Sequence, residues 1–427
     1  MNLNGWDTVS LLNIQQVNKQ LANRLSELVM TFQTFWTDGF AGAYTASGTF
    51  GPWSITGGSG SDIYLTLPVT SGTLAPQGGT SGPQTDIGGM TVTVIVNLEW
   101  VPSAVTPQGK SLQFALQQVA APGAARQPGG ISVKSVTDPH STGCGAEVGS
   151  GIANTLLDNK DKITFIFAQT GVVSTATATW LQPRQSAYSF HQPAGGDQYL
   201  AILSVTSDHD ISTLSANIDS GIASSQYPLS FAISGELFLA NVILPALPAA
   251  FTGSSVSDFA YANGAITLVS QFDLSAVQVG AIWYTPNVTS MTITINANAL
   301  KNAASGSVYL DMPSAYLDFS ATTDNVLSYN PAGDAFTFQK DPNPVTSTND
   351  RVPWYDYILT LGAVGAAITA IVLAAVESGL SDSLSGSSLA GSLSAGPATS
   401  VKWQGLEQIA VASGSLNDCF LLLANVA

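Results

Sequence analysis

A strict alternation of apolar and polar side chains is the feature that most constrains this chain. Residues 90–100 read Met-Thr-Val-Thr-Val-Ile-Val-Asn-Leu-Glu-Trp, and residues 291–296 repeat the style as Met-Thr-Ile-Thr-Ile-Asn. Because successive side chains of a β-strand point to opposite faces, such runs predict strands with one apolar face and one Thr/Asn face. The chain is therefore expected to build large antiparallel sheets that rest on a core.

Shorter runs of the same kind are punctuated by Gly and Pro, which marks turns between strands. Residues 71–89 and 378–396 are rich in Gly and Ser, so the first is expected to be a loop and the second a loop or a frayed helix tail. The remaining predicted strands occupy residues 44–67, 162–169, 199–206, the start of 230–248, 265–272, 276–284, 290–297, 306–319, 335–339, 401–412 and 416–426.

Three segments are expected to be helices that cover these sheets. Apolar residues recur close to a 3.6-residue period over residues 8–36, which is typical of an amphipathic helix. A second helix begins at Gly235 and stops before Pro245, because proline disfavours helical backbone at the residue before it. A third, uncharged helix begins near residue 354. The fold class is therefore α+β, β-dominated, with long amphipathic helices packed against large antiparallel sheets.

Charge excludes one class of partner. The 427-residue chain carries 12 Lys+Arg against 28 Asp+Glu, a formal net charge of −16, and only 9% of its residues are charged. Twelve scattered cations cannot form the basic stripe that phosphate backbones require, so nucleic acid is not expected as a partner. With 45% hydrophobic residues, the chain has ample material for a large core.

Residues 357–376 form a stretch without charge that is long enough for a membrane span. Eight of these residues are Gly or Ala, and Arg351 is the one basic residue close enough to bias a topology. A helix that is buried or lies in a groove is the favoured interpretation. A segment that inserts into a membrane is the alternative.

The N-terminal residues show no basic region followed by an apolar run, so no signal peptide is predicted. We expect synthesis in the cytoplasm, with retention there or release by a non-classical route. Cys144 and Cys419 are the two cysteines, and two separate thiols are favoured over one long-range bridge. No cysteine–histidine cluster is present, so neither a metal nor another cofactor is predicted.

Catalytic constellations are not evident. The Asp-His-Asp run at residues 208–210 follows a predicted strand, and Asp-Pro-His at residues 138–140 has turn composition, so both are interpreted as surface loops. The Gly-Gly-Ser-Gly run at residues 57–60 lacks the lysine and the following helix of a phosphate loop. Without a nucleophile elbow or a zinc-protease motif, the chain is not expected to be an enzyme.

Four segments resemble one bacterial family. Residues 4–9, Asn-Gly-Trp-Asp-Thr-Val, and residues 17–21, Val-Asn-Lys-Gln-Leu, resemble the start of the clostridial P47 proteins and their OrfX relatives. Residues 50–60, with Trp53 before a Gly-Gly-Ser turn, and residues 65–69 are similar to the second block of the family. Residues 199–206 and 231–248 are similar to a mid-chain strand and to its most recognisable helix entry.

The resemblance implies a TULIP-type fold, in which a long helix lies in a strongly curved antiparallel sheet and the apolar side chains between them line a groove for lipid tails. It also implies a non-catalytic accessory or delivery protein encoded beside bacterial toxin genes, in a neurotoxin or insecticidal cluster. The implied partners are a lipid or another hydrophobic ligand, with other proteins of the cluster and a membrane surface as further candidates.

Candidate groove residues are the apolar side chains of the predicted helices. Each of them also suits a plain core position. A lipid tail needs no specific polar residue, so the sequence cannot mark lipid contacts in the way it marks a catalytic triad. They are Leu21, Leu25, Leu28 and Phe32 on the first helix, Leu237, Phe238 and Ile243 on the middle helix, and Ile358, Leu361, Ile368 and Leu373 on the late helix.

Three further residues match the family motifs, namely Trp6, Asp7 and Trp53. Trp6 is interpreted as an anchor of the N-terminal segment against the sheet, and Asp7 as the N-cap of the first helix.

Two portions are expected to complete one elongated unit: a TULIP-like portion over residues 1–250, and a β-rich portion with the late helix over residues 251–427. The leading function is a lipid- or hydrophobe-binding accessory protein. One alternative is a structural or protein-interaction scaffold whose core is filled by side chains. The other is a membrane-acting protein that releases residues 357–376 into a bilayer.

Overall fold

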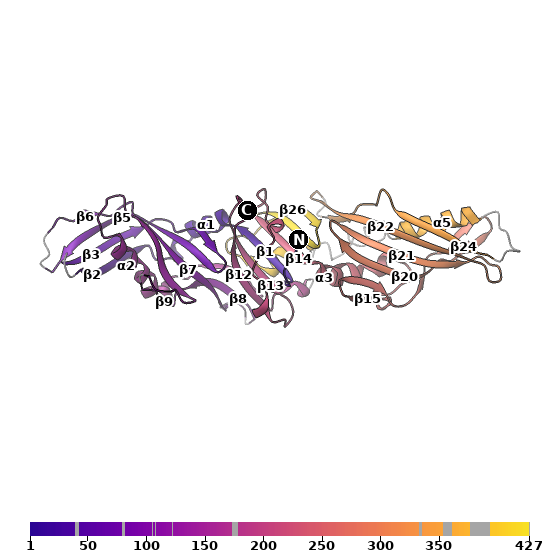
Figure 1. Cartoon of the computed structure of the whole chain (residues 1–427), viewed down its shortest axis with the longest axis horizontal. Coiled ribbons are helices and arrows are strands. Elements are labelled where there is room, and N and C mark those ends of the chain that lie inside the picture. Colours follow the sequence, from indigo (N-terminus) through magenta and orange to yellow (C-terminus); the bar gives the residue numbers. More distant parts are fainter. Residues whose placement is uncertain are drawn as a thin grey trace.

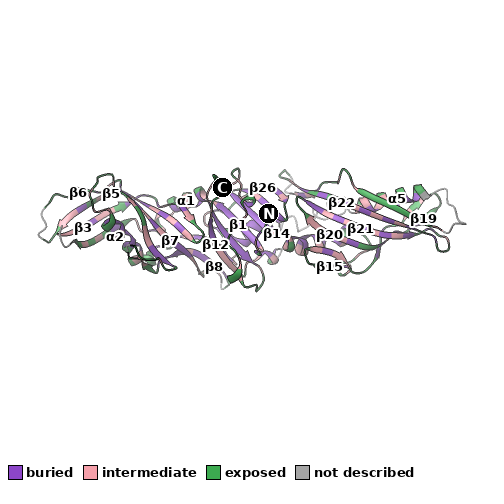
Figure 2. Cartoon of the chain, viewed as in Figure 1, coloured by how far each residue is buried: buried purple, intermediate pink, exposed green. Residues whose placement is uncertain are grey.

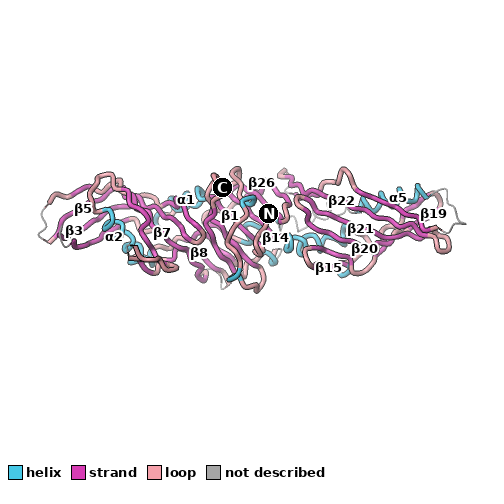
Figure 3. Tube along the Cα trace, in the orientation of Figure 1, coloured by secondary structure: helices cyan, strands magenta, loops and turns pink. Residues whose placement is uncertain are grey.

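The computed structural model describes residues 1–38, 42–78, 82–104, 106, 108–121, 123–172, 178–332, 335–352, 361–375 and 393–426. These residues form an elongated molecule, in which an N-terminal lobe, a central sheet and a C-terminal lobe follow one another along the long axis (Figure 1). Both ends of the chain lie at the central sheet (Figure 1). Strands dominate all three parts (Figure 3), so the β-dominated class with large antiparallel sheets is confirmed.

An 11-stranded sheet builds the described part of the N-terminal lobe, and its strands pair antiparallel except for β9 with β10. Residues 91–100 of the alternating run lie in β7, where Val92, Val94 and Val96 point into the core. The strands are β2 (Thr31–Asp38), β3 (Gly42–Phe50), β4 (Ser54–Ser59), β5 (Asp62–Gln77), β6 (Thr85–Asp86), β7 (Thr91–Pro102), β8 (Lys110–Ala115), β9 (Gln118–Val119), β10 (Gly130–Thr137), β11 (Ile166–Thr170) and β25 (Lys402–Trp403).

The central sheet has six described strands in the order β12-β13-β1-β14-β27-β26, all antiparallel. One face packs on the cores of the two lobes, and the N-terminal segment and residues 206–228 cover the other. Every residue of β13 is therefore buried (Figure 2), and this strand reads as a continuous apolar run. The strands are β1 (Thr8–Asn13), β12 (Gln185–His191), β13 (Tyr199–Val205), β14 (Leu229–Ser234), β26 (Ile409–Leu416) and β27 (Cys419–Val426).

An eight-stranded antiparallel sheet and a separate hairpin make up the described strands of the C-terminal lobe. The sheet contains β15 (Phe259–Ala262), β16 (Ala265–Leu268), β17 (Phe272–Asp273), β20 (Asn287–Asn296), β21 (Ala299–Tyr309), β22 (Tyr316–Asn330), β23 (Ala335–Phe338) and β24 (Val345–Arg351), and the hairpin joins β18 (Val277–Val279) to β19 (Ile282–Tyr284).

The helices are shorter than expected, and the longest in the described part of the chain, α2 and α5, have 14 residues each. Long amphipathic helices are therefore not found among the described residues. The α-helices are α1 (Ile14–Asn23), α2 (Gly145–Asp158), α3 (Gly235–Phe238), α4 (Leu244–Ala250), α5 (Leu361–Ala374) and α8 (Gly396–Ser400).

The prediction of one helix over residues 8–36 was wrong. The segment folds as β1, α1, a short 3₁₀ turn and β2. Because both faces of β1 are buried, its apolar residues do not alternate, and their spacing imitates a helical period. The helix begins only after Asn13, whose side chain accepts a hydrogen bond from the Gln15 amide at 2.8 Å.

The prediction that the middle helix stops before Pro245 was also wrong. A π-helical turn at Leu239–Ile243 joins α3 to α4, and helical backbone continues to Ala250. Proline has no backbone N–H, so it leaves a carbonyl of the preceding turn without its usual donor. A π-turn changes the hydrogen-bond register at this point.

Helix α2 was missed, and part of the predicted 71–89 loop is strand, because β5 extends to Gln77. The predicted division at residue 250 coincides with the end of α4 and stays a prediction. The chain after residue 392 returns to the central sheet and to β25 of the N-terminal lobe.

No disulfide joins Cys144 to Cys419, and two separate thiols were the favoured prediction.

The uncharged late segment is helical over Leu361–Ala374, as predicted for that part. The helix packs on β22, β24 and β18. Among the described residues, no helix has the length and apolar character that crossing a membrane requires.

Candidate ligand groove in the N-terminal lobe

Helix α2 positions the candidate groove. It packs against β2 on one side and β10 on the other. Val148, Ile152 and Leu156 recur every four residues and are fully buried in the core of the lobe. The helix approaches β2 closely because Gly151 has no side chain, and a Cβ atom there would lie 2.2 Å from Thr34 Oγ1.

A groove of about 850 Å³ lies between the C-terminal turn of α2 and the strands β2, β3 and β5. This volume is in the range of small-molecule sites. The strands supply Thr31, Phe32, Gln33, Ser47, Gly48, Thr49, Ser71, Gly72 and Thr73, and the end of α2 supplies Thr155, Asp158 and Asn159.

Phe32 is the one aromatic side chain among these lining residues, and it lies over the bare backbone of Gly48. Its ring stacks on Phe50 at a centroid distance of 5.0 Å. Phe50 begins a continuous row of buried rings that runs into the core of the lobe through Trp53, Phe114, Phe167 and Phe165.

The row contains one orphaned polar group. Trp53 is buried, and its Nε1–H has no hydrogen-bond partner within the described structure. An unpaired buried donor is energetically costly.

The rim of the groove is rich in neutral hydrogen-bonding groups. Asn159 Nδ2 donates to the Thr155 carbonyl at 2.9 Å, and Lys162 Nζ donates to Asn159 Oδ1 at 2.9 Å. Asp158 is the one ionisable group among the described lining residues. The groove thus has a lining rich in hydroxyl and amide groups, with the buried ring of Phe32 beneath it.

The predicted groove residues do not line one continuous groove, because they fall into two separate cores. Leu21 on α1, Leu25, Leu28 and Phe32 belong to the core of the N-terminal lobe. Of these four, Phe32 lines the groove. Whether any of the four contacts a ligand stays a prediction.

The other candidates belong to the core of the C-terminal lobe. Phe238 and Ile243 are fully buried there, and Leu237 is half-buried beside them. On α5, Ile368 is buried and Leu373 is half-buried. Ile358 and the side chain of Leu361 lie outside the described residues.

The N-terminal motif residues hold the chain start on the central sheet. Trp6 is buried, and its Nε1–H donates to the Ser215 carbonyl at 2.8 Å. Asp7 is not a helix cap, because it precedes β1. Its Oδ2 accepts hydrogen bonds from Thr206 N at 2.7 Å and from Thr206 Oγ1 at 2.9 Å, which ties β1 to the end of β13.

The Gly-Gly-Ser-Gly run also has a structural role, because it forms the end of β4 and the start of the turn to β5. A Cβ atom on Gly58 would lie 2.5 Å from the Phe190 ring, and the Phe190 amide donates to the Gly60 carbonyl at 2.6 Å. The turn therefore fits tightly against β12, where the N-terminal lobe meets the central sheet.

The histidine-containing runs are loops, as interpreted from their composition. Asp208 pairs with Arg184 at 2.9 Å on the surface, and Asp210 accepts from the Ser212 amide at the start of a 3₁₀ turn. Within the described residues, no group of three His, Cys, Asp or Glu side chains could hold a metal ion.

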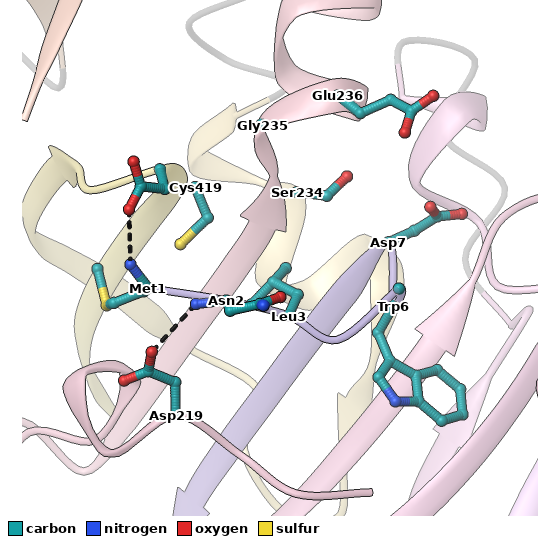
Figure 4. A pocket seen from close by; sticks show the side chains of 12 residues that line it. Met1, Asn2, Leu3, Trp6, Asp7, Asp219, Ser234, Gly235, Glu236 and Cys419 are labelled. Carbon is teal, nitrogen blue, oxygen red and sulfur yellow. Dashed lines mark hydrogen bonds and ion pairs between the residues drawn. The ribbon is translucent and has the colours of Figure 1, made fainter. Parts of the chain in front are cut away.

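A second cavity, of about 540 Å³, lies where the N-terminal segment meets α3 and β27 (Figure 4). The Met1 nitrogen donates to Asp418 Oδ2 at 3.2 Å, and the Asn2 amide donates to Asp219 Oδ2 at 3.0 Å. Hydrogen bonds from the Gly221 and Asn2 amides hold the pKa of Asp219 below its usual value. These carboxylates fix the N-terminal segment, and we assign this cavity no ligand.

Sequence reasoning singled out Phe32 alone among the lining residues, and three of the residues that it missed, Thr155, Asp158 and Asn159, come from α2 and the residue after it. The signal that could have found this helix is the spacing of Val148, Ile152 and Leu156, which is partly hidden by the small residues between them.

The described residues define an elongated protein of three large, mainly antiparallel sheets, with a candidate ligand groove in one lobe whose described lining shows no catalytic cluster. A family model described as "OrfX-like: Protein OrfX2/OrfX3/P47" matches residues 3–393. The chain therefore belongs to the OrfX-like family, as the sequence motifs had indicated.

The chain is 26% identical to Protein P47 of Clostridium botulinum (strain Kyoto / Type A2) over 364 residues, which cover 81% of this chain and 82% of that protein. The structure of P47 from Clostridium botulinum A2 matches with a TM-score of 0.80 at 24% identity, over 100% of this chain and 98% of that one. The crystal structure of P47 of Clostridium botulinum E1 matches with a TM-score of 0.74 at 21% identity, over 99% and 100%. These matches show that the fold is shared.

Proposed function

We propose that this chain is a non-catalytic protein that binds a lipid or another hydrophobic ligand, and that it serves as an accessory protein of a bacterial toxin-type gene cluster. The groove between α2 and the strands β2, β3 and β5 carries the binding part of the proposal. Membership of the OrfX-like family supports the accessory part.

The apolar part of the ligand would lie over Phe32, and its polar end would bond to the hydroxyl and amide groups of the rim. Each buried CH₂ group contributes about 0.8 kcal/mol, so a fatty acyl chain can outweigh the entropic cost of association. On this proposal the N-terminal lobe has a TULIP-type arrangement, in which α2 lies against a curved sheet.

A non-catalytic role agrees with the lining of the groove. General acid–base chemistry uses at least one well-placed titratable group, and most hydrolytic sites use two or three in mutual contact. Asp158 is the one titratable group among the described lining residues.

A palmitate-binding comparison of two tryptophan variants tests the groove. Thr73→Trp introduces a large ring at an exposed lining position, and Thr346→Trp is the matched control on the exposed strand β24. By equilibrium dialysis, Thr73→Trp should weaken palmitate binding at least about tenfold, while the control changes it less than about twofold. If Thr73→Trp and Thr346→Trp bind palmitate equally well, the groove is not the ligand site.

One alternative is favoured by a specific observation. Leu21, Phe238, Ile243 and Ile368 are all fully buried in side-chain packing. A chain whose lobes are filled in this way could act as a protein-interaction scaffold. Absence of any bound or exchangeable lipid would support that reading.

A further inference from the structure

Six uncharged polar side chains form a grid on one face of the sheet in the N-terminal groove. The strand register places Thr31 opposite Thr49 and Thr49 opposite Ser71, and it aligns the other three in a second row. Because side chains two residues apart on a strand share a face, all six point to the same side of the sheet. The six are Thr31 and Gln33 of β2, Ser47 and Thr49 of β3, and Ser71 and Thr73 of β5.

The protein itself does not use the hydrogen-bonding groups of this grid. Ser47 is half-buried and the other five are exposed, and none of the six side chains bonds to another residue within the described structure. A row of threonines on β4, β5 and β7 differs, because Thr56 bonds to Thr66 at 2.7 Å and Thr66 to Thr93 at 3.1 Å between their Oγ1 atoms. The grid therefore keeps its donors and acceptors available to a molecule in the groove.

The charges beside the grid do not favour an anion. Asp158, the one ionisable group among the described lining residues, lies in the last turn of α2. The C-terminal end of a helix carries a partial negative charge, which adds to that of the carboxylate. Lys160 and Lys162 follow outside the described lining with Asp161 between them, and Lys162 Nζ donates to Asn159 Oδ1 at 2.9 Å. An uncharged polar group is therefore the better match for this groove.

We propose that the grid holds an uncharged polyhydroxyl group, such as a sugar or glycerol, as the polar end of the ligand. Each hydroxyl and amide of the grid can both donate and accept a hydrogen bond, as the hydroxyls of a polyol do. Neighbouring strands lie about 4.8 Å apart, and side chains on one face recur about every 6.8 Å along a strand, so one sugar ring can reach several of them. This inference rests on the proposed function, because the grid lines the same groove.

Calorimetric titration at neutral pH with dodecyl glucoside, laurate and free glucose tests the proposal, with both lipids below their critical micelle concentrations. Wild-type protein should bind dodecyl glucoside at least about fivefold more tightly than laurate, because the glucosyl group bonds to the grid and the carboxylate is repelled by Asp158. The preference should persist in Asp161→Asn, whose lost charge lies outside the described lining, and Asp158→Asn should tighten laurate binding more than that control does.

Two double variants separate the grid from hydroxyl loss in general. Thr31→Val/Thr73→Val keeps the side-chain shapes but removes one hydroxyl from each row, so dodecyl glucoside should bind at least about tenfold more weakly. Thr56→Val/Thr93→Val is the matched control, because it removes two hydroxyls from the self-bonded threonine row of the same lobe. The control should change binding of either lipid less than about twofold.

The inference is overturned, and the proposed function is not, if laurate binds as tightly as dodecyl glucoside or if the two double variants lose binding equally. If free glucose displaces dodecyl glucoside at a similar concentration, the polyhydroxyl chemistry is supported but its source is a soluble sugar, and the lipid of the proposed function is wrong. If none of the three molecules binds, both proposals fall.

Discussion

At the residue scale, Asp7 shows how a correctly located motif residue can have a role other than the predicted one. Its position before an apolar run resembles a helix N-cap, but its partner Thr206 lies almost 200 positions away in the sequence. Local sequence cannot report such a contact. The same holds for Gly58, whose tight fit depends on Phe190 of the central sheet.

Replacing Asp7 tests this role. Asp7→Ala removes the acceptor of two Thr206 hydrogen bonds and should lower the free energy of unfolding by about 1–3 kcal/mol. Asp7→Asn keeps a side-chain acceptor and should cost less. Asp161→Ala, at an exposed position, is the control and should change stability by less than about 0.5 kcal/mol. Urea unfolding measures all three, and an Asp7→Ala variant as stable as the control would refute the assignment.

Cys419 makes a pH-dependent contribution to stability. Burial raises the pKa of its thiol to about 11 from a reference of 9.0, so the folded chain holds the proton more tightly than the unfolded chain. The contribution is fully present below pH 9.0 and declines as the pH rises towards 11.

Between pH 8.5 and 10.5, the wild-type chain should therefore lose more stability than Cys419→Ala, by at most about 2 kcal/mol. Urea unfolding in reducing buffer at the two pH values provides the comparison. Groups other than Cys419 titrate in both proteins, so their effect cancels. Equal losses would mean that the thiol is not desolvated in the folded state.

At the element scale, prediction succeeded where one pattern dominated locally. Strand β7 alternates because one of its faces meets the core, and its boundaries were predicted closely. Prediction failed for residues 8–36, because β1 is buried on both faces and its apolar residues merge with those of α1. It also failed for α2, where glycines required for close packing reduce the helical signal.

The glycine contact of α2 leads to a stability prediction. Gly151→Ala gains helix propensity of about 1 kcal/mol, but its Cβ would meet Thr34 Oγ1 at 2.2 Å, well inside van der Waals contact. Overpacking of this kind costs about 1–3 kcal/mol, so a net loss of stability is expected.

Gly362→Ala on α5 is the matched control, because a Cβ atom there would meet no atom of the described residues within 4 Å. Thermal unfolding should show a lower midpoint for Gly151→Ala and an unchanged or higher midpoint for Gly362→Ala. A stabilised Gly151→Ala variant would show that α2 does not lie against β2 as described.

At the scale of the whole molecule, the class of fold could be predicted, but the arrangement of its parts could not. The sheets follow from local alternation, whereas the central sheet unites β1, β12–β14 and β26–β27 from distant parts of the chain. The candidate groove residues of the predicted helices belong to two separate cores, and whether any of them contacts a ligand stays a prediction. The N-terminal groove needed the position of α2, which the sequence pattern did not reveal.

The central claim is that the chain carries a hydrophobic ligand. Native mass spectrometry of gently purified wild-type protein, followed by extraction and identification of bound molecules, tests it most directly. We expect a discrete adduct with the mass of a phospholipid or fatty acid, reduced in Thr73→Trp and retained in Thr346→Trp. A clean mass of the protein alone, repeated after incubation with mixed lipids, would contradict the account and leave a filled scaffold in its place.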